Sequence, residues 1–115
     1  MRAGDHGEAC DIGFYGPMEI INAEVERMIL DFQAMHRRNA RKRAYLAARH
    51  HRPVRLVIIL EDTQRNRTAV ALHASVISTA YPAGSREVLH ALRTGEPLGR
   101  DGLLWVRRRK PPRPR

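Results

Sequence analysis

Residues 54–67 read VRLVIILEDTQRNR, and this stretch predicts the fold class. Its first half, VRLVIIL, is rich in β-branched residues and almost continuously apolar, which is typical of a central strand covered on both faces. Asp62 or Thr63 then supplies a suitable N-cap for a helix over about residues 63–79. A buried strand that leads into a helix predicts an α/β fold with a small, partly parallel sheet flanked by helices.

The sequence on either side of this stretch predicts the remaining elements. Apolar residues at three- and four-residue spacing indicate a long helix before the central strand. Ser85 is suited to cap a later helix, and Gly95 is suited to end it. The expected elements are strands at 12–15 or 18–26 and at 103–106, and helices at about 24–48 and about 86–94.

The chain has 115 residues, enough for one domain with a modest core. We expect a single α/β domain over residues 12–106, preceded by an irregular polar segment at 1–11. The residues RRRKPPRPR at 107–115 cannot pack and are expected to form a disordered basic tail. Cys10 is the only cysteine, so no intrachain disulfide can form, and no apolar run approaches the length of a membrane span. These features favour a cytoplasmic protein without a membrane partner.

The charge of the chain is concentrated in blocks. The net charge is +9, residues 32–60 contain eight basic residues and no acid, and the segment from residue 104 onward adds six more. Two basic blocks on a roughly neutral body favour a polyanionic partner, most simply nucleic acid. The alternative is codon usage, because 19 of the 21 basic residues are arginine.

The first turn of the helix expected after residue 62 contains Arg65 and Arg67, although the helix dipole disfavours cations there. Backbone N–H groups at the helix start, together with Arg65, Asn66 and Arg67, would form an anion site there, and a bound anion would explain this placement. The alternative is that Asp62 pairs with Arg65 and Glu61 pairs with Arg67. The candidate phosphate-binding residues of the whole chain are Arg37, Arg38, Arg41, Lys42, Arg65, Arg67, Arg107, Arg108, Arg109 and Lys110.

A second candidate site lies around Glu24 and Glu26, whose side chains point to the same face if they lie on a strand. Two such carboxylates can hold a divalent ion, and Glu19 and Asp31 can add to the site. Gln33 would lie beside it. The alternative is that these acids simply favour a nearby helix start, since E-x-E is a weak motif. No zinc-ligand spacing occurs, so we expect no cofactor, or Mg²⁺ or Mn²⁺ if these acids form an active site.

Three short motifs occur in order between about residues 20 and 106. An acid-x-acid stretch leads into a helix with D-x-Q and paired arginines, a buried strand ends in D-T-x-x-N-R, and a G-x-D-G turn precedes the last strand. In this order they resemble the C-terminal domain of actinobacterial helix-turn-helix transcriptional regulators. The matching residues are Glu24, Glu26, Asp31, Gln33, Arg37 and Arg38, then Asp62, Thr63, Asn66 and Arg67, then Gly99, Asp101 and Gly102.

The resemblance implies a restriction-endonuclease-like core, with a small mixed sheet and acids placed for a divalent metal. A nuclease of that class usually has lysine where this chain has Glu26, and the helix-turn-helix segment is missing. We therefore expect a non-catalytic, DNA-binding regulatory domain that contacts phosphates through arginines. The alternatives are a metal-dependent nuclease using Glu24, Glu26 and Gln33, and a protein-interaction module. A homodimer is possible in each case.

Overall fold

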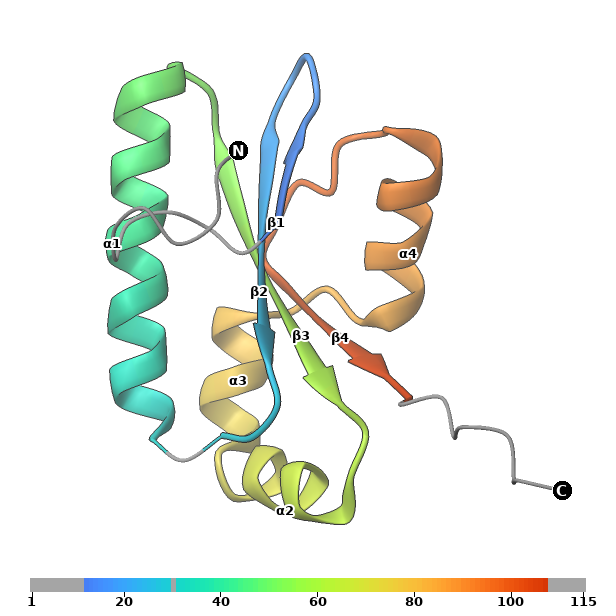
Figure 1. The fold of residues 1–115 in the computed structure, drawn as a ribbon. Coiled ribbons are helices and arrows are strands. Elements are labelled where there is room, and N and C mark those ends of the chain that lie inside the picture. Colours follow the sequence, from blue (N-terminus) through green and yellow to red (C-terminus); the bar gives the residue numbers. More distant parts are fainter. Residues whose placement is uncertain (1–11, 30, 108–115) are drawn as a thin grey trace, which may run out of the picture.

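A mixed four-stranded sheet forms the centre of the computed structural model, which describes residues 12–29 and 31–107 (Figure 1). The strands lie in chain order, β1-β2-β3-β4; β1 is antiparallel to β2, and β2, β3 and β4 are parallel. The predicted α/β fold with a partly parallel sheet is confirmed. The strands are β1 (Ile12–Tyr15), β2 (Ile20–Glu26), β3 (Val54–Glu61) and β4 (Gly102–Val106).

Helices cover both faces of the sheet (Figure 1). Helix α1 (Phe32–His50) joins β2 to β3, while α2 (Gln64–Leu72), α3 (Ala74–Ala80) and α4 (Ser85–Thr94) lie between β3 and β4. Helices α1 and α3 pack on one face and α4 packs on the other. Within the described ranges, no helix is long and apolar enough to cross a bilayer.

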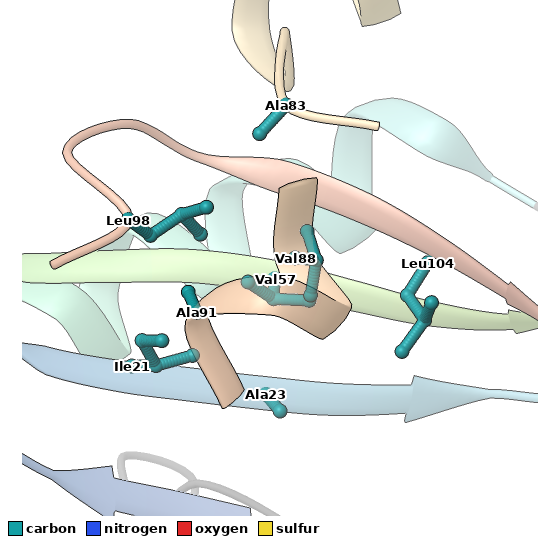
Figure 2. Close-up of a cluster of buried hydrophobic side chains, with 8 residues drawn as sticks. All are labelled: Ile21, Ala23, Val57, Ala83, Val88, Ala91, Leu98 and Leu104. Carbon is teal, nitrogen blue, oxygen red and sulfur yellow. The ribbon is translucent and has the colours of Figure 1, made fainter. Parts of the chain in front are cut away.

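Strand β3 is the centre of the core, as its apolar sequence predicted. Alternate residues of β3 point to opposite faces, so Leu56, Ile58 and Leu60 pack with α1 and α3, while Val57 packs beneath α4. Figure 2 shows the cluster on the α4 face, formed by Ile21, Ala23, Val57, Ala83, Val88, Ala91, Leu98 and Leu104.

Two predicted helix boundaries are wrong. The first helix begins at Phe32 rather than near residue 24, because residues 20–26 pair with β3 along the whole of β2. Asp31 marks the true start, and its Oδ1 accepts a hydrogen bond from the N–H of Ala34 at 3.0 Å. The helix expected at 63–79 is interrupted at His73, which separates α2 from α3.

The predicted helix caps are confirmed at two of three positions. Thr63 caps α2, since its Oγ1 accepts from the N–H of Asn66 at 3.1 Å. Gly95 ends α4 in the left-handed region, with φ 77°. Ser85 does not cap α4, because its hydroxyl oxygen accepts from the N–H of Trp105 at 3.0 Å instead. The expectations for 1–11 and for the tail, Arg107 apart, lie outside the described residues.

Candidate nucleic-acid interface

Helix α1 contains six lysine and arginine residues and no acid. Three of the six are paired with carboxylates from outside the helix. Arg38 Nη2 lies 2.6 Å from Glu26 Oε1, Lys42 is paired with Glu24, and Arg43 is paired with Asp101. One half of the helix charge is therefore neutralised by neighbouring elements of the fold.

The other three basic residues of α1 are Arg37, Arg41 and Arg49, which we term the α1 arginine row. All three are exposed, and within the described part of the chain none has a carboxylate partner. Their spacing of four and eight residues keeps them near one side of the helix, over a rise of about 18 Å. Tyr45 lies between Arg41 and Arg49, and its hydroxyl oxygen is 3.4 Å from Arg49 Nη1.

Lys42 does not lie on the exposed side with these arginines, so its predicted position is wrong. It belongs to the buried stripe of α1 that faces the sheet, together with Met35 and Leu46, and only 7% of its surface is exposed. Below it lies Glu24, which is 2% exposed. A lysine at a core position is tolerated here because a strand carboxylate neutralises its charge.

Glu24 and Glu26 point to the α1 side of the sheet, which confirms the predicted shared face. Each carboxylate forms an ion pair with a basic residue of α1, Glu24 with Lys42 and Glu26 with Arg38. Asp31 is occupied at the N-cap of α1, and Gln33 is exposed. In residues 12–29 and 31–107, no three His, Cys, Asp or Glu side chains gather at a point where they would hold a metal ion.

Glu19 lies away from the other acids, and its hydrogen bonds join separate parts of the fold. It is buried, and its carboxylate accepts hydrogen bonds from the backbone N–H groups of Leu98 and Gly99 and from the guanidinium of Arg55. These contacts tie the start of β2 to the loop before β4. Glu19 therefore does not extend a site around Glu24 and Glu26.

The interface between α1 and β2 is polar in its centre. Asn22 on β2 and Asn39 on α1 are both fully buried, and the Asn22 amide makes no hydrogen bond to another described residue. Nearby, the Tyr81 hydroxyl lies 2.8 Å from His36 Nδ1. Burial raises the pKa of Tyr81 to about 12, although Asn39 and then Arg43 partly oppose this rise. This interface gains less from apolar burial than the rest of the core.

Arg67 is explained by contacts within the fold. Its Nε and Nη2 donate to the two carboxylate oxygens of Asp62 at 2.8 and 2.9 Å, and its guanidinium carbon lies 3.8 Å from the ring centroid of Trp105. The hydrogen bonds from Arg67 hold the pKa of the Asp62 carboxyl below its usual value. The alternative pairing of Asp62 with Arg65 and of Glu61 with Arg67 is wrong. Arg65 is exposed and has no carboxylate partner among the described residues.

The predicted place of Asn66 in an anion site beside Arg65 and Arg67 is wrong, because its amide is bonded to backbone groups. Asn66 is buried, and its Nδ2 donates to the carbonyl oxygens of Arg27 and Glu61 at 2.8 and 2.9 Å. Its Oδ1 accepts from the N–H of Ile29 at 3.2 Å. One amide side chain therefore joins the segment after β2 to the end of β3.

Comparisons of this chain with models of known protein families, with curated proteins and with solved structures gave no match. Arg107 is exposed at the end of β4, and Arg108, Arg109 and Lys110 lie outside the described part. The feature that distinguishes α1 is a row of exposed arginines on a helix whose other cations are already paired.

Proposed function

We propose that this protein is a non-catalytic, nucleic-acid-associated domain that contacts DNA phosphates through the α1 arginine row. The observation that carries this proposal is the division of charge on α1. Arg38, Lys42 and Arg43 have carboxylate partners, whereas Arg37, Arg41 and Arg49 are exposed without one. The carboxylates of Glu24, Glu26 and Asp101 therefore neutralise one part of the helix and leave the charge of the other three arginines uncompensated within the described residues.

The unpaired row is unfavourable for the isolated domain. Like charges four residues apart on a helix repel one another, and Arg37 and Arg41 have this spacing. A polyanion laid against the helix removes this repulsion and releases counterions from its phosphates. Guanidinium groups suit this role because they bind phosphate oxygens through two parallel N–H donors.

Other basic residues would extend the contact surface. Arg65 and Arg107 are exposed near the carboxyl ends of β3 and β4, and residues 108–115 add five further positive charges by sequence. Phosphate contacts position a protein on DNA without reading its bases, so we expect little sequence preference. The resemblance to regulator C-terminal domains would give such a domain a regulatory role.

Metal-dependent cleavage is a less suitable function for this site, because a nuclease needs carboxylates that are available to a cation. Glu24 is held by Lys42 and Glu26 by Arg38, so binding a metal there would require both ion pairs to break. The remaining acids considered above, Glu19 and Asp31, are engaged with backbone N–H groups. The charge pattern of α1 favours binding over catalysis.

A binding titration with a short labelled DNA duplex tests the proposal. The variant Arg37→Ala/Arg41→Ala removes two charges from the row, and Arg86→Ala/Arg93→Ala removes two exposed charges from α4 on the opposite face of the sheet. We expect the first variant to bind on the order of tenfold or more weakly, about 1.4 kcal/mol or more, and the second to change much less. Equal losses in the two variants would show that binding follows net charge and not the α1 row.

A further inference from the structure

One aromatic side chain lies within the α1 arginine row. Tyr45 follows Arg41 by four residues and precedes Arg49 by four, and it is 44% exposed. Each of these steps rises about 6 Å along the helix, so the phenol ring and the two guanidinium groups follow one another near one side. Phe32, the other Phe, Tyr or Trp residue of α1, is buried in the core. Tyr45 therefore provides the one exposed ring of this kind on the helix.

The contacts of Tyr45 do not cover this ring. Its hydroxyl oxygen accepts a long hydrogen bond from Arg49 Nη1 at 3.4 Å, and this contact is made at the edge of the ring. Within residues 12–29 and 31–107, no aromatic ring packs against Tyr45 and no guanidinium lies over its face. The packing of the described residues therefore gives no reason for an aromatic side chain at this position.

The residues next to the row are small. Ala40, Ala44 and Ala48 are exposed at four-residue spacing, each directly before Tyr45 or an arginine of the row. Alanine has no long side chain that would hold a ligand away from the helix. A chain-like ligand laid along the row can therefore come close to the Tyr45 ring and to the arginines on either side of it.

An exposed aromatic residue alone is ordinary at a protein surface. Tyr45 differs because it lies between Arg41 and Arg49, which have no carboxylate partner in the described part of the chain. A ligand that suits all three side chains has anionic groups for the guanidinium groups and a flat ring for the phenol. A strand of nucleotides has both, at regular spacing along one chain.

We infer that Tyr45 stacks on an unpaired base, which makes the α1 arginine row a site for single-stranded DNA; this inference rests on the proposed function. The bases of a duplex are covered by their neighbours, whereas those of a single strand can pack on aromatic side chains, whichever base is present. The phosphates beside such a base then contact Arg41 and Arg49. The row extends over about 18 Å, which corresponds to roughly five nucleotides at a rise of about 3.4 Å each.

Binding titrations with three labelled probes of equal length separate stacking from phosphate contact. The probes are an oligothymidylate strand, its duplex with oligoadenylate, and a strand of the same number of abasic nucleotides. Only the first offers exposed bases. We expect the parent protein to bind it more tightly than the other two at the same salt concentration. Tyr45→Ala should weaken binding of the oligothymidylate on the order of tenfold, and should change binding of the duplex and of the abasic strand much less.

Tyr45→Phe is the matched control, because it keeps the ring and removes only the hydroxyl group. It should bind the oligothymidylate nearly as tightly as the parent protein does. A loss in Tyr45→Phe as large as in Tyr45→Ala would assign the contact to the hydroxyl and overturn the inference. Tyr45→Ala binding the oligothymidylate as tightly as the parent, or losing equally on all three probes, would also overturn it.

These outcomes leave the proposed function intact, because they concern the ring and not the arginines. The proposed function fails in a different way. If Arg37→Ala/Arg41→Ala binds all three probes as tightly as the parent protein, the row does not contact phosphates, and both the proposed function and the stacking inference are contradicted. Circular dichroism spectra that match the parent protein exclude unfolding as the cause of any loss.

Discussion

The carboxylate of Glu24 on β2 and the ammonium of Lys42 on α1 form an ion pair that is buried between the sheet and the helix. The pair lies in an interface that also contains the buried amides of Asn22 and Asn39. Charge pairing therefore helps to stabilise this interface, whereas apolar packing stabilises the rest of the core. Paired in this way, Lys42 and Glu24 are unavailable to phosphate and to metal.

Removing one partner of this pair is expected to destabilise the fold more than replacing both. Lys42→Met removes the cation that neutralises the buried carboxylate of Glu24 and should lower the free energy of unfolding by about 3–5 kcal/mol. The double variant Lys42→Met/Glu24→Gln should recover much of that loss, because no buried charge remains. Urea unfolding of the three proteins measures both quantities. A double variant as unstable as the single one would contradict this account of the pair.

Gly102 is expected to resist substitution because β4 begins in contact with the segment before α4. A Cβ at this position would lie 2.7 Å from Val88 Cγ2 and 2.8 Å from the carbonyl oxygen of Ala83. Ala83 is held by backbone hydrogen bonds to Asp101 and Leu103, so it cannot move away freely. We expect Gly102→Ala to cost about 1–3 kcal/mol of stability, as overpacking does. Thermal unfolding measures the loss.

Gly84→Ala is the control for that experiment, because no atom lies within 4 Å of the Cβ it would add. Gly84 is the N-cap residue of α4, and the change from glycine to alanine there should cost less than about 1 kcal/mol. Equal losses for Gly84→Ala and Gly102→Ala would show that the Gly102 effect comes from the backbone and not from crowding.

Asn66→Ala is expected to loosen the junction between β2 and β3. The change leaves the part-buried carbonyl oxygens of Arg27 and Glu61 and the N–H of Ile29 without their partner. A fully buried group left unpaired costs about 1–3 kcal/mol, and these part-buried groups should each cost less because water can reach them. The exposed neighbour Gln64 serves as the control, and Gln64→Ala should leave stability nearly unchanged. Hydrogen exchange at the Ile29 amide, slow in the parent protein and fast in Asn66→Ala, provides a local measurement.

Tyr81 gives the protein a predicted sensitivity to alkali. Its pKa is raised from 10.0 to about 12 because burial disfavours the phenolate. The raised pKa contributes stability that is complete below the unfolded pKa of 10.0 and is lost as pH rises toward 12. Melting temperatures across this window should fall for the parent protein and fall less steeply for Tyr81→Phe. Parallel curves for the two proteins would contradict the assignment.

The sequence predicted the central strand and the α/β class well, because VRLVIIL is distinctive and its burial follows directly from its composition. It failed at the start of α1, where Val25 and Met28 fit a helical period but pairing with β3 makes residues 20–26 a strand. Local periodicity carries no information about such long-range pairing.

The candidate site was predictable only in part, for the same reason. Arg37 and Arg41 were identified correctly as exposed, because their spacing places them opposite the apolar stripe. Lys42 was misplaced because its partner Glu24 is distant in sequence and the pair forms only in the folded chain. Asn66 was assigned to an anion site instead of the fold, since the sequence near it does not reveal backbone partners as distant as Arg27 and Ile29.

The salt dependence of DNA binding tests the central claim most directly, because each phosphate contact contributes a slope of about −0.9 to log affinity against log salt concentration. If Arg37, Arg41 and Arg49 each contact a phosphate, replacing all three with alanine should make the slope shallower by about 2.7. The α4 variant Arg86→Ala/Arg93→Ala should keep the parent slope. A triple variant with the parent slope, or a parent protein whose DNA affinity does not depend on salt, would contradict the account.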